Sequence, residues 1–283
     1  MRTFAAPVLY ALFVWWFSTG LILFLDGLPR RTFPLTMSVA TALLVAGLAT
    51  LFAVRDDGSA FGAYAAFTAS LAVWGWNEMA FLTGWLTGPR RSECAPHLRG
   101  FARFVQAARM ILWHELAIAA GFLLVLAVGW GGENAVGLWV YLVLWAMRLS
   151  AKLNIFLGVP NPPLAFLPER LRYLASGFRT RAMNALFPLS ITASTALCAL
   201  LGAWTFHAGS EGAAIGFALL AALMALAVLE HWFLVLPLPS ERLWAWGFQS
   251  SHQASMRAAA PEGAAAVGAV VGYQDIKTKG SAS

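Results

Sequence analysis

Seven stretches of the sequence are apolar over about the length of a membrane-spanning helix. A helix needs roughly 20 mainly apolar residues to cross the hydrocarbon core of a bilayer, and it satisfies its backbone hydrogen bonds internally. Only 11% of the residues are charged, against about 25% in soluble domains. We therefore predict an all-α, polytopic integral membrane helix bundle. The expected spans cover residues 5–27, 34–54, 60–87, 109–129, 135–157, 183–206 and 212–238.

The two ends of the chain define its organisation. The apolar stretch 4–25 is too long for the core of a signal peptide, and no A-x-A-like site follows it, so we interpret it as the first span. We divide the chain into a transmembrane helical bundle, residues 1–240, and a cytoplasmic C-terminal tail, residues 241–283. Residues 241–248, with three aromatic side chains, are expected to lie in the membrane interface. The Ala/Gly/Ser-rich stretch from Ala258 is expected to be disordered.

Basic residues fall almost entirely on one side of the predicted bundle. With these spans, 17 of the 19 Lys and Arg residues lie on the side of the C-terminus, and only Arg2 and Arg55 lie on the other. Because cytoplasmic loops of membrane proteins are enriched in Lys and Arg, we predict an outside N-terminus and a cytoplasmic C-terminus. The net charge of +6 then follows from topology, and nucleic acid is not an expected partner. The expected environment is the lipid bilayer, including its anionic lipids.

Eight ionisable residues interrupt the spans at similar depth. A charged group inside a span is costly and by default marks a function or a structural pair. At a rise of about 1.5 Å per residue, all eight lie within roughly 15 Å of the predicted cytoplasmic interface. We call this set the polar layer and take it as the candidate site. It consists of Asp26, Glu78, His114, Glu115, Arg148, Lys152, Glu230 and His231.

The sequence leaves three interpretations of the polar layer open, of which the first is a structural ion-pair network. Arg148 and Lys152 lie four residues apart, on one face of a helix, where like charges repel. They therefore need anions, because buried charges in a membrane are normally paired. The carboxylates at suitable depth are those of Glu78, Glu115 and Glu230.

The second interpretation is a metal site. The polar layer supplies two imidazoles and three carboxylates from three helices, and sets of this kind hold di-iron sites in helical bundles. Against this, adjacent residues on a helix diverge by about 100°, so neither His-Glu pair can chelate one ion alone. The sequence also has no H-E-x-x-H or E-x-x-H motif. A metal would require at least three of these side chains to converge.

The third interpretation is a tetrapyrrole site. A neutral histidine inside a span can be the axial ligand of a bound macrocycle, and the candidates are His114 and His231. Thirteen tryptophans offer flat apolar walls, although Trp is ordinary at membrane boundaries.

Two further segments carry structural predictions. Gly84 and Gly88 form a G-x-x-x-G spacing, which can let two helices approach closely. The segment 154–173 contains four prolines, which prevent a continuous helix, but it is too apolar for a free linker. We expect it to fold back against the cytoplasmic face of the bundle, below the polar layer.

Five ordered segments of the chain together resemble the PuhE family. Its members are called photosynthetic complex assembly proteins of phototrophic proteobacteria. The segments hold seven residues of interest, which are Asp26, Glu78, His114, Glu115, Asn154, Glu230 and His231. The resemblance extends over residues 10–240 and rests on residues 17–33, 74–90, 112–119, 152–174 and 229–239.

The resemblance implies a multi-pass protein of the bacterial inner membrane, either cytoplasmic or intracytoplasmic and photosynthetic, encoded near the reaction-centre H subunit. It implies a non-enzymatic role in assembly of the reaction-centre/light-harvesting complex and a link to the level of bacteriochlorophyll. The candidate cofactor is bacteriochlorophyll or a tetrapyrrole precursor. Partners would be reaction-centre or light-harvesting subunits and other assembly factors. No catalytic residue is carried over. The alternative is an integral membrane, metal-dependent enzyme of pigment metabolism that uses the Glu/His layer.

Overall fold

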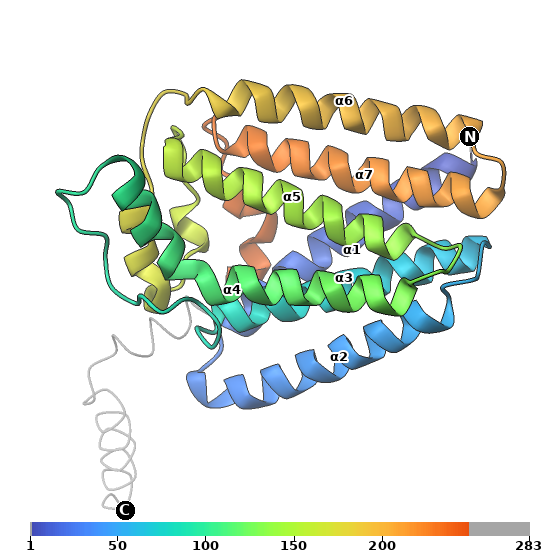
Figure 1. Ribbon diagram of the computed structural model, residues 1–283, viewed down its shortest axis with the longest axis horizontal. Helices are drawn as coiled ribbons and strands as arrows, with labels where there is room; N and C mark the ends of the chain where they lie inside the picture. The colour runs from blue at the N-terminus through green and yellow to red at the C-terminus, as the bar shows by residue number, and fades with distance from the viewer. Residues whose placement is uncertain (1, 249–283) are drawn as a thin grey trace, which may run out of the picture.

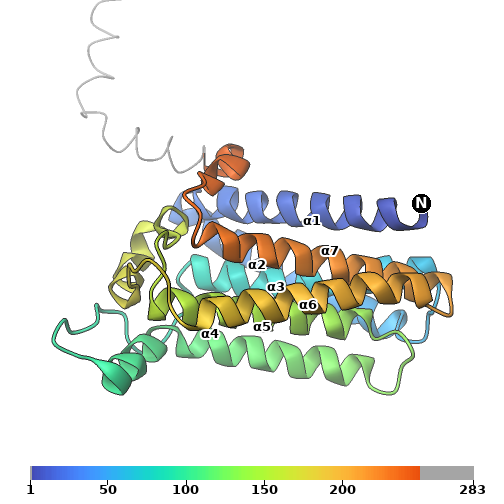
Figure 2. The ribbon, with the colours of Figure 1, turned by 90° about the horizontal axis from the view of Figure 1, so that it is seen from above.

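The computed structural model describes residues 2–248, and its long elements are all α-helices (Figure 1). The helices run roughly along one common direction and are joined at the two ends of the molecule (Figures 1 and 2). The predicted fold class, a polytopic helical membrane bundle, is confirmed. The seven long helices of the described residues are α1 (Arg2–Asp26), α2 (Phe33–Ala53), α3 (Ala60–Leu82), α4 (Gly100–Gly129), α5 (Val136–Leu157), α6 (Leu186–His207) and α7 (Glu211–Phe233).

The centre of the bundle is formed by α3 and α7. Twelve of the 23 residues of α3 and twelve of the 23 of α7 are buried, against three of 22 in α6. Six of the long helices in the described chain are apolar enough to cross a membrane, and α3 is the exception. The reason is its position: a helix surrounded by protein can carry Asn77 and Glu78, because neither side chain faces lipid. The seventh span and the orientation of the bundle remain predictions.

The core consists of side chains that α3, α5 and α7 direct at one another. Phe67 of α3, Val140 of α5 and Leu219 of α7 are fully buried in one cluster. A second cluster joins Val73 of α3 to Tyr141 of α5 and to residues of α2 and α4. Five residues of the polar layer, Glu78, Arg148, Lys152, Glu230 and His231, lie on these three helices.

The predicted third span is too long, because α3 ends at Leu82. Gly84 adopts a φ of +79°, a left-handed conformation that favours glycine, and the amide of Leu86 donates to the carbonyl of Ala80. The prediction that Gly84 and Gly88 form a helix-packing G-x-x-x-G motif is wrong, since both glycines lie beyond the end of α3. A Cβ on Gly88 would lie 2.2 Å from the carbonyl oxygen of Arg109, so this glycine brings the chain against the backbone of α4.

The fourth helix starts earlier than predicted, at Gly100, and bends after its first turns (Figure 1). The chain after α3 inserts its backbone there. The amide of His114 donates to the carbonyl of Thr87, at 2.9 Å, and the amide of Arg90 donates to that of Arg109, at 3.2 Å. A helix bends where a group from another segment accepts a hydrogen bond that would otherwise be made within the helix. The bend thus lies one turn before the first polar-layer residue of α4.

The proline-containing connection after α5 folds back on the end of the bundle, as expected. It contains two short 3₁₀ helices, η2 (Leu164–Phe166) and η3 (Glu169–Gly177). The amide of Asn161 donates to the carbonyl of Leu234, just beyond α7. Arg170 of η3 reaches the ends of α1 and α3, as described below.

The predicted interfacial segment packs against α1. Its first part is the 3₁₀ helix η4 (Ser240–Trp244). The indole of Trp16 donates to the carbonyl of Leu243, and the indole of Trp244 donates to the carbonyl of Trp16, at 2.8 and 3.0 Å. The stretch from Ala258, predicted to be disordered, lies outside the described residues.

Candidate functional site

The centre of the polar layer is two ion pairs that α5 makes with its neighbours. Arg148 Nη2 lies 3.1 Å from Glu78 Oε2 of α3, and Lys152 Nζ lies 2.5 Å from Glu115 Oε1 of α4. Two cations one turn apart on α5 would repel each other, and each receives a carboxylate from a different helix. The structure therefore contains the predicted ion pairs of Arg148 and Lys152 with carboxylates. The two pairs join α5 to α3 and to α4.

Glu230 of α7 makes a different contact from the one predicted. Its Oε1 accepts a hydrogen bond from the indole of Trp15 of α1, at 2.8 Å. Its charge acts on Arg148 without a direct ion pair between them. Glu230 consequently connects α7 to α1 at the edge of the polar layer.

His231 is held on both ring nitrogens. Its Nε2 lies 3.0 Å from Ser150 Oγ of α5, and its Nδ1 lies 2.9 Å from the carbonyl oxygen of Ala227. A carbonyl oxygen can only accept, so Nδ1 carries the proton of this contact. Ser150 is in turn 3.0 Å from Ser190 of α6. The histidine thus begins a polar chain that crosses from α7 through α5 to α6.

His114 of α4 is buried against an aromatic ring. Its imidazole stacks on Phe81 of α3 with ring centroids 4.3 Å apart, and the residue is 1% exposed. Its Nδ1 has no hydrogen-bond partner in the described part of the chain. Glu78 of α3 is close enough to act on this imidazole electrostatically.

Asp26 lies apart from the rest of the polar layer. It ends α1 and forms an ion pair with Arg170 of η3. The Arg170 guanidinium also donates to the carbonyl of Leu82 at 2.7 Å and lies over the ring of Phe33, 4.7 Å from its centroid. Burial lowers the pKa of Arg170 below its usual value. Asp26 and Arg170 therefore connect the folded-back loop to the ends of α1, α2 and α3.

Several partners within the site were missed by sequence reasoning. Tyr141 of α5 donates to the carbonyl of Ile118, and Asn77 Nδ2 donates to Tyr141 Oη at 3.2 Å. Asn77 was visible as an amide in an apolar run, but Trp15, Tyr141, Ser150 and Ser190 are ordinary residues of membrane helices. Arg170 was read only as a basic loop residue. No sequence pattern distinguishes these residues from their neighbours.

Some buried polar atoms in the site are left unpaired. Asn77 Oδ1, Glu78 Oε1, His114 Nδ1 and Asn154 Oδ1 are buried and have no partner within residues 2–248. A buried polar atom without a hydrogen bond is costly, and most such atoms in folded proteins are satisfied. The first three lie on α3 and α4 around the Glu78–Arg148 pair. The arrangement can accept hydrogen bonds from a donor that enters between these two helices.

The convergence that a metal site requires is not found. Within residues 2–248, no group of three or more His, Cys, Asp or Glu side chains is arranged to hold a metal ion. The adjacent residues of α4 have different neighbours, since His114 stacks on Phe81 and Glu115 pairs with Lys152. The divergence of neighbouring side chains on a helix explains this separation.

The arrangement also leaves no space for a macrocycle beside either histidine. His114 and His231 are each 1% exposed, and both nitrogens of His231 are already in contact with protein atoms. A planar pigment could reach either imidazole only if the helices separated.

Comparison with known proteins gives two matches. The family model described as "Protein of unknown function (DUF3623)" matches residues 1–255, and so includes all seven long helices and the polar layer. A Rhodobacter capsulatus protein described as "Uncharacterized 30.4 kDa protein in puhA 5'region" is 42% identical over 260 residues, which cover 89% of this chain and 94% of that protein. No solved structure matches the chain.

Proposed function

We propose that this chain, which belongs to the DUF3623 family, is a non-enzymatic assembly factor for the photosynthetic reaction-centre/light-harvesting complex. The multi-pass helical fold supports a site of action inside the bilayer. The printed description of the Rhodobacter capsulatus relative refers to the puhA 5' region. The resemblance to the PuhE family implies a gene near that of the reaction-centre H subunit. Both descriptions support a photosynthetic context.

The observation that carries the proposal is the set of unpaired buried polar atoms on α3 and α4. Asn77 is held by hydrogen bonds to Val73 and Tyr141, Glu78 by its ion pair with Arg148, and His114 by stacking on Phe81. Their atoms Oδ1, Oε1 and Nδ1 nevertheless lack hydrogen-bond partners in the described chain. In the low dielectric of a membrane protein, a donor supplied by a client would remove this cost.

The same geometry favours a protein client over a pigment. The two histidines are buried, and the unpaired Asn77 and Glu78 oxygens call for donors such as the hydroxyl, amide or amine of a nascent transmembrane helix. Bacteriochlorophyll or a precursor is the alternative client, and it would require wider separation of the helices. We place the protein in the bacterial inner membrane with the loop-rich end, which carries most arginines, in the cytoplasm.

His114→Phe is expected to separate a functional role of the polar layer from a structural one. Phenylalanine keeps the ring that stacks on Phe81 but removes the unpaired nitrogen. Replacing a buried unsatisfied group by an apolar one of similar shape is nearly neutral or stabilising. We therefore expect the variant to be as stable as the wild type in mild detergent, and to support at most about half of the wild-type yield of assembled complex. The yield is read from the near-infrared absorption of membranes in a deletion background.

His207→Phe is the matched control, because it makes the same change near the far end of α6, at an exposed residue. It should leave the yield unchanged. A stable His114→Phe variant with full complex yield would show that the polar layer only holds the helices together.

A further inference from the structure

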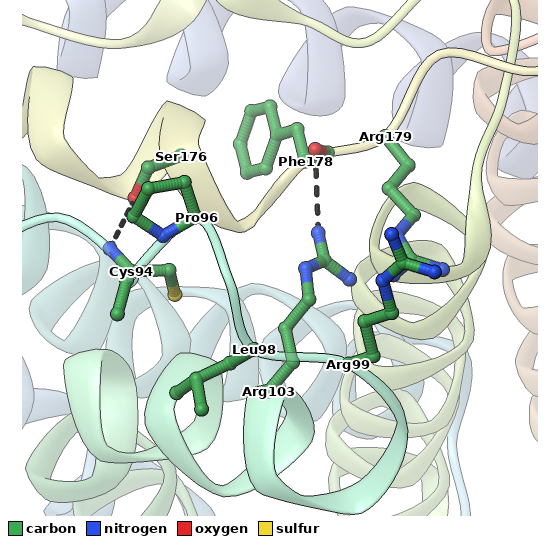
Figure 3. A pocket seen from close by; sticks show the side chains of 9 residues that line it. Cys94, Pro96, Leu98, Arg99, Arg103, Ser176, Phe178 and Arg179 are labelled. Atoms are coloured by element: carbon green, nitrogen blue, oxygen red, sulfur yellow. Dashed lines mark hydrogen bonds between the residues drawn. The ribbon is translucent and has the colours of Figure 1, made fainter.

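A cavity at the loop-rich end of the molecule is lined by three arginines and by no acidic residue. It has a volume of about 290 Å³ and lies between the chain that leads into α4, the first turn of α4, and the end of η3 with the residues that follow it. Figure 3 shows Arg99, Arg103 and Arg179 together with the neighbouring wall of the cavity. The cavity is separate from the polar layer.

The charge in this cavity is uncompensated. None of the three arginines forms an ion pair within the described part of the chain, and Arg181 adds a further positive charge that acts on Arg103. The first turn of α4 carries no acidic residue, and its N-cap, Arg99, makes no side-chain cap. The positive end of the helix dipole therefore adds to the same field. Like charges at this density repel unless an anion lies between them.

The three guanidinium groups differ in how many hydrogen bonds they already make to the protein. Arg103 is 6% exposed and donates to the carbonyl oxygens of Gly177 and Phe178, at 2.8 and 3.4 Å, while stacking on Phe156. It is therefore fixed as one wall of the cavity. The guanidinium groups of Arg99 and Arg179 donate no hydrogen bond to residues 2–248 and so keep their donors for a ligand. Planar guanidinium groups bind phosphate oxygens in pairs, with charge-assisted hydrogen bonds.

The helix that carries Arg103 also presents exposed apolar side chains. On the outer face of α4, Phe101 is 78% exposed and Phe104 is 39% exposed. Leu112 and Trp113, farther along α4, are also exposed. These exposed apolar side chains are carried by the same helix as Arg103, and they are suited to contact with acyl chains. We propose that the cavity of Arg99, Arg103 and Arg179 binds a phosphate group, carried either by an anionic lipid or by a free phosphate compound.

The test is thermal unfolding of the purified full chain with two probes. In one arm, phosphatidylcholine nanodiscs contain an increasing fraction of phosphatidylglycerol. In the other, glycerol 3-phosphate is added to protein in mild detergent at constant ionic strength. We expect phosphatidylglycerol to raise the unfolding temperature of the wild type. The double variant Arg99→Gln/Arg179→Gln should weaken the apparent affinity about tenfold or more, since hydrogen bonds to charged groups are strong. Arg103 is left unchanged because its contacts are structural.

The matched control is Arg30→Gln/Arg31→Gln, which removes the same charge from the turn between α1 and α2, where the chain lies at the same end of the bundle. It should stay within about twofold of the wild type, which excludes a general effect of net charge. A response to glycerol 3-phosphate that depends on Arg99 and Arg179 would assign the phosphate to a free compound. If the double variant responds like the wild type to both probes, the cavity is not a phosphate site.

Discussion

Arg148→Met is expected to lower the free energy of unfolding by about 3–5 kcal/mol, the range found when one partner of a buried ion pair is removed. The loss follows from what remains behind. The Glu78 side chain is 11% exposed, and its only ion-pair partner in the described chain is Arg148, at 3.1 Å. Without the arginine, a buried carboxylate must lie uncompensated in a low dielectric or take up a proton. The measurement is equilibrium unfolding of the purified protein in mild detergent.

Removing the carboxylate instead, by Glu78→Gln, should lower the free energy of unfolding less. The double variant Glu78→Gln/Arg148→Met should recover most of the stability that Arg148→Met loses. In the wild type, the Arg148 side chain is 45% exposed. After Glu78→Gln, it still experiences the charges of Glu115 and Glu230. It can therefore turn toward the interface, as long basic side chains do. In Glu78→Gln/Arg148→Met no buried charge is left at this position. If the two single effects simply add, the pair contributes no coupling and the ion-pair interpretation fails.

Arg170→Ala is expected to release the folded-back loop from the bundle and to cost about 2–4 kcal/mol. One guanidinium pairs with Asp26, donates to the carbonyl of Leu82 and covers the ring of Phe33. Its removal leaves the mostly buried Asp26 carboxylate without a cation, and charged hydrogen bonds of this kind contribute about 1.5–3 kcal/mol each. Amide hydrogen exchange over residues 158–185 should rise, together with the rate of tryptic cleavage at the loop arginines.

Arg172→Ala is the control for this second prediction. Arg172 lies two residues away, and its ion pair with Glu169 is exposed on both sides. Exposed pairs contribute little, so the change should stay within about 0.5 kcal/mol of the wild type. Equal hydrogen exchange in Arg170→Ala and Arg172→Ala would contradict the proposed role of Arg170.

Much of the fold could be predicted because hydrophobic length is a local property. Each of the seven long helices overlaps an expected span. The errors lie at ends that depend on distant contacts. The third span stops at Leu82 because Gly84 turns the chain, and α4 extends back to Gly100 because the inserted segment bends it instead of ending it. Neither contact can be predicted from the hydropathy of the sequence.

The candidate site was predictable in depth but not in pairing. Counting residues from the loops placed Glu78, Glu115, Arg148 and Lys152 at one level, and they do meet there. Which helix faces which cannot be derived from depth alone. Glu230 was expected to meet a cation and meets Trp15, while Asp26 meets Arg170 of the loop. Aromatic donors and loop arginines compete for the same carboxylates, and only packing decides between them.

The most direct test of the assembly role is one pigment and complex analysis of a phototrophic strain that lacks this protein. Assembled reaction-centre/light-harvesting complex is measured by membrane absorption, and pigment intermediates are measured by chromatography of the extract. Our account predicts a reduced amount of complex, restored by the wild-type chain, without accumulation of any one pigment precursor. A precursor that accumulates would indicate an enzyme of pigment metabolism instead. An unchanged amount of complex would contradict an assembly role altogether.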